Sequence, residues 1–123
     1  MKWGKRKPER RRADRYPVNL EAECTDSRDN APKGCKVTDI SREDFGVRLH
    51  IKGQVEVGDE LQLVLHAPQR TPPVIFRVAA CWIEQIMDDE GYEVMVGCKL
   101  VEIAPQDKHF LMEYAYQNWF KKV

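Results

Sequence analysis

The chain has 123 residues, of which 42% are hydrophobic and 33% are charged. This length and composition suit one folded domain with one core, and they exclude a wholly disordered chain. No apolar run is long enough for a membrane span or for the core of a signal peptide, so we expect a cytoplasmic protein that does not insert into membranes. We predict a flexible basic arm over residues 1–9 and a single domain over residues 10–123.

The net charge of zero hides an asymmetry between the two ends of the sequence. Residues 1–15 carry eight basic and two acidic side chains, a net charge of +6, whereas the remaining residues carry 12 basic and 18 acidic side chains, a net charge of −6. A basic arm on an acidic body indicates either an anionic partner for the arm or an arm that docks on its own body.

Short segments of alternating hydrophobicity follow the arm and predict β-strands. The first, over residues 18–25, places Val18, Leu20, Ala22 and Cys24 on one face. Glycine at position 97 would allow a bend or a close approach within the last strand. We expect six strands, at residues 18–25, 35–40, 46–51, 61–65, 74–86 and 92–103, with the fifth interrupted near residues 79–80.

After the last strand the hydrophobic period changes to that of a helix. Pro105 suits a first helical turn, and Asp107 lies where the helix dipole favours negative charge. The apolar stripe of this helix comprises Phe110, Leu111, Tyr114, Ala115 and Trp119. The fold class is therefore mainly β, with six short antiparallel strands that favour a closed barrel and a C-terminal helix that covers one mouth or side.

The sequence contains no recognisable catalytic constellation. We find no nucleophile elbow, no phosphate-binding loop and no zinc-protease motif, and we therefore expect a protein that is not an enzyme and that has no cofactor. The four cysteines have no metal-binding or redox spacing and the three histidines share none, so no metal site is expected. Reduced thiols are expected, with Cys81 and Cys98 in the core.

Two polar motifs remain to be explained. Asp39 and Ser41 are two residues apart on a strand, so both side chains can face one object, and a carboxylate with a hydroxyl can read the polar edge of a guanine. Upstream, Arg10, Arg11 and Arg15 form a cluster whose guanidinium groups suit phosphate oxygens and the acceptor edge of guanine. The function depends on whether these motifs meet over one ligand.

With these motifs in this order, one strand and one hairpin apart, the chain resembles the PilZ domain family. The pattern is Arg-Arg-x-x-x-Arg before the first strand and Asp-x-Ser between the second and third strands, and the similarity covers about residues 9–119. The resemblance implies a PilZ-type six-stranded barrel that binds the bacterial second messenger cyclic di-GMP. It also implies an arm that becomes ordered on ligand binding and signals to a downstream protein. The sequence does not identify that protein, and it leaves open whether the chain forms a homodimer.

The resemblance assigns ligand-binding roles to six positions. They are Arg10, Arg11, Arg15, Asp39, Ser41 and Asp44. Asp44 departs from the family pattern, which has glycine there. An added carboxylate near an anionic ligand would cost on the order of 1 kcal/mol, or about tenfold in affinity.

Two alternatives to a cyclic di-GMP receptor follow from the sequence. Asp44 motivates the first, a divergent PilZ fold that contacts proteins without nucleotide. The second is a small barrel that binds nucleic acid through the basic arm. We expect no nucleic acid partner, because the acidic body would repel a polyanion and the strands show few exposed aromatic residues for base stacking.

Overall fold

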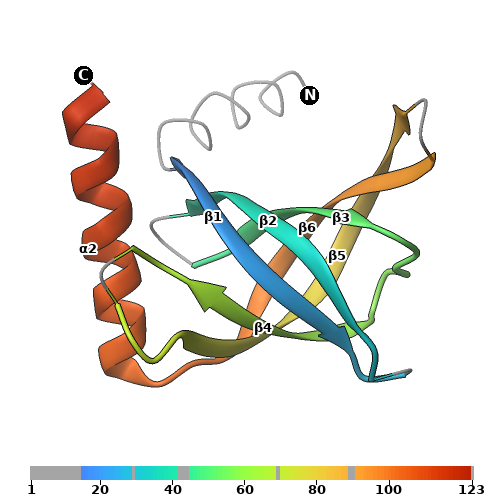
Figure 1. Cartoon of the computed structure of the whole chain (residues 1–123), viewed down its shortest axis with the longest axis horizontal. Helices are drawn as coiled ribbons and strands as arrows, with labels where there is room; N and C mark the ends of the chain where they lie inside the picture. The colour runs from blue at the N-terminus through green and yellow to red at the C-terminus, as the bar shows by residue number, and fades with distance from the viewer. Residues whose placement is uncertain (1–14, 29, 42–44, 69, 89–90, 123) are drawn as a thin grey trace, which may run out of the picture.

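Six antiparallel strands close into a barrel, and one helix packs beside it (Figure 1). The computed structural model describes residues 15–122, apart from residues 29, 42–44, 69 and 89–90. The elements are β1 (Arg15–Asp26), β2 (Pro32–Ser41), β3 (Val47–Lys52), β4 (Glu60–His66), β5 (Val74–Asp88), β6 (Gly91–Glu102) and α2 (Pro105–Lys122). The order around the barrel is β1-β2-β3-β6-β5-β4. The predicted six-stranded barrel with a C-terminal helix is thus confirmed.

Alternation along the strands fills the barrel with branched apolar side chains. In β4, Leu61, Leu63 and Leu65 are buried while the residues between them are exposed or partly exposed. Val18 to Cys24 in β1 follow the predicted pattern, with every second side chain buried. Successive side chains of a strand point to opposite faces, and closure of the sheet turns one face entirely inward.

The helix begins at Pro105, as predicted, and packs mainly against β1. Its buried stripe includes Leu111 and Ala115, neither of which is exposed to solvent. Arg70, in the loop before β5, donates from Nη2 to Asp107 Oδ1 at 2.6 Å and lies 4.6 Å from the ring centre of Phe110. These contacts fix the loop to the first turns of α2. No described helix is long and apolar enough to cross a membrane.

The fifth strand corrects one prediction. Its register against β6 shifts between Ala80 and Trp82, and Cys81 at this irregularity is exposed, whereas Cys98 is buried as predicted. The prediction that Cys81 belongs to the core was wrong, because an inserted residue changes the direction of the side chains that follow it. Burial raises the pKa of the Cys98 thiol to about 12.

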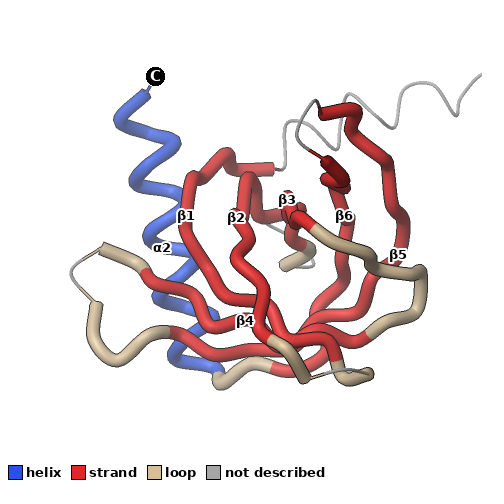
Figure 2. Tube along the Cα trace, turned by 45° about the vertical axis from the view of Figure 1, so that its right-hand side comes forward, coloured by secondary structure: helices blue, strands red, loops and turns tan. Residues whose placement is uncertain are grey.

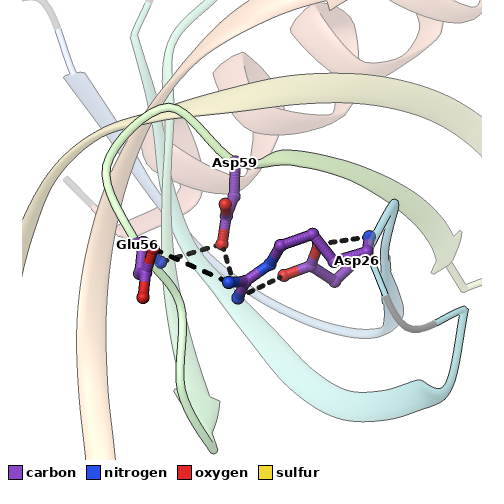
Figure 3. A network of polar contacts seen from close by, with 4 residues as sticks. Asp26, Glu56 and Asp59 are labelled. Carbon is purple, nitrogen blue, oxygen red and sulfur yellow. Dashed lines mark hydrogen bonds and ion pairs between the residues drawn. The ribbon is translucent and has the colours of Figure 1, made fainter.

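An ionic network joins the β1–β2 loop to the β3–β4 loop (Figure 3). Asp26 is 2% exposed, and its Oδ1 accepts from the backbone N–H of Arg28 at 2.9 Å. The Arg28 guanidinium lies 3.4 Å from Asp26 Oδ2 and 3.1 Å from Asp59 Oδ2, with Glu56 Oε1 at 3.6 Å. Burial alone would raise the pKa of Asp26, but the hydrogen bonds from Arg28 outweigh it and lower that pKa. The network therefore stabilises this end of the barrel while Asp26 is charged.

Replacing Asp26 by asparagine is expected to lower the free energy of unfolding by about 1–3 kcal/mol at neutral pH, through loss of charge-assisted hydrogen bonds. Because the folded-state pKa is below the ordinary value of 3.8, this contribution is complete above about pH 4 and disappears as the pH falls through the folded pKa. Denaturant unfolding at pH 7 and near pH 2.5 should therefore show a smaller difference at the lower pH. Glu113→Gln, on the exposed face of α2, is the control and should change stability by less than about 0.5 kcal/mol. An equal loss for Asp26→Asn at both pH values would contradict the role of the charge.

Candidate functional site

The strand registers place one row of residues across the outside of the barrel. The row runs from Pro17 on β1 through Asp39, Arg48 and Gly97 to Trp82 on β5, each paired with the next. Five adjacent strands thus contribute one residue each.

The outward direction of this row follows from the burial of its neighbours. Val47 and Leu49 on either side of Arg48 are fully buried, and so are Val96 beside Gly97 and Ile40 beside Asp39. The row therefore faces solvent over the packed core, on rigid strands that fix the spacing of its side chains.

Asp39 lies between two arginines. Its Oδ1 accepts from Arg15 Nε at 2.8 Å, and its Oδ2 lies 3.4 Å from Arg48 Nε. All three side chains are partly buried, with exposed fractions of 18%, 15% and 33% for Arg15, Asp39 and Arg48. Partial burial strengthens such pairs relative to fully exposed ones. The carboxylate therefore holds two guanidinium groups on one patch and retains acceptor capacity for a third donor.

Arg48 has an enclosed Nε–H that makes no hydrogen bond, so its contact with Asp39 is an ion pair only. Its guanidinium carbon lies 5.8 Å from the ring centre of Trp82, within the range of a cation–π contact. Arg48 therefore links the carboxylate of Asp39, on the neighbouring strand β2, to the indole at the β5 end of the row.

Trp82 lies against Gly97, and it can do so only because Gly97 has no side chain. A Cβ atom at position 97 would lie 2.1 Å from Cε2 of the indole, well inside contact distance. The predicted close approach at this glycine is thus confirmed. The indole is nevertheless 43% exposed, so part of its aromatic surface remains open to solvent beside Arg48.

Ser41 lies at the end of β2 opposite Arg15. It is 8% exposed, and its backbone N–H donates to the carbonyl of Gly46 at 2.7 Å, which closes the turn into β3. Asp39 and Ser41 flank the inward-facing Ile40, so they lie on the same face of the strand, as the sequence predicted. The structure thus brings Arg15, Asp39 and Ser41 together from two motifs that are far apart in the sequence.

The turn that follows Ser41 contains residues 42–44, so Asp44 lies outside the described residues, as do Arg10 and Arg11. Phe45, directly after this turn, has a positive φ of 54° and is fully buried, with an edge-to-face contact to Phe76 at 5.8 Å between ring centres. A left-handed conformation is uncommon for a phenylalanine. Here the buried aromatic contact holds it in place and so fixes the end of the turn beside the site.

The outer face next to this row carries ionisable groups of both signs, and Lys36 Nζ lies 3.8 Å from Glu21 Oε2. At the next outward-facing positions of β2 and β3, Lys36 pairs in register with His50. Lys52 is the outward-facing residue of β3 that follows His50. Carboxylates are also present, since Glu93 Oε2 lies 3.5 Å from His50 Nδ1. The cations that could meet an anionic ligand beside Asp39 are therefore the two arginines of the site, Arg15 and Arg48.

Sequence reasoning missed Arg48 and Trp82. Each is a single residue within a strand and belongs to neither motif. The available signal was the alternation of β3, which places Arg48 between two apolar residues and hence on the outer face. No comparable signal marked Trp82, because the irregularity at Cys81 decides its direction.

The described residues of the row lie on a partly exposed surface, where Trp82 is 43% exposed. A hollow of about 210 Å³ lies on β1, β4 and β5, where Thr25, Glu60 and Arg77 line part of it, and it shares no residue with the row. Within the described residues, no group of three or more histidine, cysteine or acidic side chains could hold a metal ion. The arrangement has the groups for recognising a flat polar anion: two guanidinium groups, a carboxylate, a hydroxyl and an open aromatic surface.

Comparison with known families gives the identity of the fold. The sequence matches the family model of the PilZ domain over residues 9–117, which is most of the chain. This chain belongs to the PilZ domain family. PilZ domains are receptor and regulatory modules, and the match spans both polar motifs.

Among solved structures, the Bacillus subtilis inhibitor of motility (MotI/DgrA) is similar to this PilZ domain, with a TM-score of 0.65 at 15% identity. The similarity covers 88% of this chain and 50% of the other, so this chain spans half the length of that protein. At this identity the similarity concerns the fold alone. No curated protein matches the sequence.

Proposed function

We propose that this PilZ domain is a receptor for cyclic di-GMP. The observation that supports the proposal best is the meeting of the two motifs: Arg15 from the first and Asp39 from the second are 2.8 Å apart. This pair lies beside Ser41, which is 8% exposed, on the side of the barrel that also carries Arg48 and an exposed indole. The chain also belongs to the PilZ family, whose fold is a cyclic di-GMP receptor fold, and this membership supports the same proposal.

In this proposal each side chain has a defined chemical role. The carboxylate of Asp39 accepts hydrogen bonds from guanine N–H groups, and Ser41 contributes its hydroxyl to the same edge. Arg15 and Arg48 contact phosphate oxygens or the acceptor edge of guanine. Trp82 offers its open surface for base stacking, which is worth about 1–3 kcal/mol per base.

The basic arm would complete the site. Arg10 and Arg11 add two guanidinium groups that reach the phosphates or stack on the bases, and they do so when the arm becomes ordered over the barrel. An arm that is ordered only with nucleotide alters the surface offered to a protein partner. The domain would in this way convert the concentration of cyclic di-GMP into a protein contact in the cytoplasm.

Isothermal titration with cyclic di-GMP tests the proposal. We expect saturable binding by the wild-type chain and a loss of about 30-fold in affinity for Arg15→Ala, because one charged hydrogen-bonding partner is removed. Arg77→Ala is the matched control: Arg77 is also an outer-face arginine, paired with Glu60 and Glu102, and it lies outside the row. Absence of heat at high micromolar nucleotide, or equal losses for the two variants, would refute the receptor proposal.

Asp44 supports a second candidate, a PilZ fold that contacts proteins and does not bind nucleotide. If the added carboxylate is the obstacle, Asp44→Gly should raise affinity for cyclic di-GMP by about tenfold or create binding where the wild type has none. The same titration measures this change in affinity. A second aspartate-to-glycine variant, Asp107→Gly, would not serve as the control, because Asp107 lies in α2. Asp59→Asn, in the β3–β4 loop, removes one carboxylate elsewhere and should leave affinity unchanged. Equal affinities for wild type and Asp44→Gly would exclude Asp44 as the obstacle.

A further inference from the structure

The fifth strand is longer than the neighbour that covers one of its edges. β5 pairs with β4 only from Val74 to Ala79, whereas it pairs with β6 as far as Asp88. The β5–β6 hairpin therefore continues past the end of β4, and both overall views show it projecting from the barrel (Figures 1 and 2).

The last residue of β5 with a partner on the β4 side is Ala80. Its N–H donates to the carbonyl of Asp59 and its carbonyl accepts from the N–H of Gly58, both at 2.9 Å. Beyond this point, within the part of the chain that the structure describes, no strand or loop pairs with that edge of residues 81–86. The segment thus has one edge hydrogen-bonded to β6 and one edge open.

Past the irregularity between Ala80 and Trp82, this open edge has few of the devices that protect a strand from pairing. Residues 81–86 contain neither proline nor lysine, and their length of about 20 Å is enough for a ladder of several hydrogen bonds. Trp82 is exposed, and Ile83 and Ile86 are only partly buried, so apolar side chains flank the backbone groups. The one protective charge is Glu84, which is exposed.

The net charge of the β5–β6 hairpin indicates which kind of strand can pair with its open edge. Residues 81–98 contain five acidic residues and no lysine or arginine. Pairing of this edge with the same edge of a second copy would bring two strongly acidic hairpins together, which like-charge repulsion disfavours. A strand with basic side chains would gain both the main-chain ladder and favourable charge pairs.

We propose that the open edge of β5 at residues 81–86 is a docking site for an extended, lysine- or arginine-rich segment of a partner protein, which adds to the sheet as a further strand. Main-chain hydrogen bonds supply the pairing, and the acidic hairpin selects a basic partner. This inference does not depend on nucleotide binding.

The test uses the full chain and a fluorescent synthetic peptide in which lysine alternates with valine. Fluorescence anisotropy should show saturable binding, and hydrogen exchange measured by mass spectrometry should show new protection at residues 81–86. A peptide with glutamate in place of each lysine should bind at least about tenfold more weakly. No saturable binding of the lysine peptide, or binding without protection of residues 81–86, would overturn the proposal.

Charge reversal on the strand provides the matched comparison. Glu84→Lys should weaken binding of the lysine peptide by about tenfold. Glu23→Lys changes an exposed glutamate on β1, where the strand is paired on both sides with Gly34 and Val64, and should change affinity less than about twofold. Equal losses for the two variants would point to attraction by overall charge. Protection of residues 81–86 that rises with protein concentration, without peptide, would show instead that a second copy occupies the edge.

Discussion

Replacing Gly97 by valine is expected to lower the affinity for cyclic di-GMP by about 30-fold while the barrel stays folded. A Cβ at this position would lie 2.1 Å from the Trp82 indole, so the ring cannot keep its place. Because the indole is 43% exposed, it can swing into solvent without opening the core. The proposed nucleotide site then loses its stacking surface, worth about 1–3 kcal/mol per base, and Arg48 loses its aromatic contact. Titration of the variant with cyclic di-GMP measures the effect.

Gly34→Val controls for the introduction of a β-branched residue in a strand. A Cβ on Gly34 would meet no atom within 4 Å, so this variant should bind as the wild type does. Tryptophan emission should shift to longer wavelength in Gly97→Val only, since the indole becomes more hydrated, and circular dichroism should show the same strand content in both variants. Wild-type affinity in Gly97→Val, together with shifted emission, would remove Trp82 from the proposed site.

The barrel was predictable because its signals are local and repeated. Each strand shows its period of two over several residues, and each loop contains residues that break strands. The number of strands and, apart from β5 beyond Ala80, their inward faces therefore follow from the sequence. The helix was equally clear from Pro105 and the change of period. The strand ends were less predictable: β1 begins at Arg15, because pairing with β2 extends the strand past the alternating segment.

The site was only half predictable, because register and bulges are properties of strand pairs. The shared orientation of Asp39 and Ser41 could be predicted, because it depends only on the two-residue period of a single strand. Trp82 was not, because in β5 the residues from Val74 to Ala80 that point inward are the even-numbered ones, which predicts an inward Trp82. The register shift between Ala80 and Trp82 reverses this, and the indole faces outward onto Gly97. One extra residue exchanges the two faces of a strand. The sequence predicted an interruption near residues 79–80, next to this irregularity, but it did not show which face the following residues take.

The same reasoning applies to Arg48. Its outward direction can be read from β3 alone, but its place opposite Asp39 depends on a second irregularity, between Val37 and Asp39 in β2. Only the folded barrel shows that Asp39, from the second motif, lies between Arg15, from the first motif, and Arg48, which belongs to neither motif.

Replacing Asp39 by alanine is expected to reduce affinity for cyclic di-GMP by more than about 100-fold. The carboxylate is the acceptor proposed for two guanine N–H groups, and a hydrogen bond to a charged partner contributes about 1.5–3 kcal/mol. It also positions Arg15 at 2.8 Å and Arg48 at 3.4 Å. Stability should change by less than about 1 kcal/mol, because both guanidinium groups remain partly accessible to water. Titration and thermal unfolding of the same sample separate the two effects.

A double-mutant cycle with Arg48→Ala distinguishes direct contact from positioning. If Arg48 acts mainly by orienting Asp39, its removal should weaken binding in the wild-type background and have little further effect once Asp39 is alanine. If Arg48 contacts the nucleotide itself, the two losses should add. Glu102→Ala, which removes an outer-face carboxylate paired with Arg77, is the control and should bind normally. Retention of wild-type affinity by Asp39→Ala would exclude Asp39 as the guanine acceptor, because no other described carboxylate in the row could take that role.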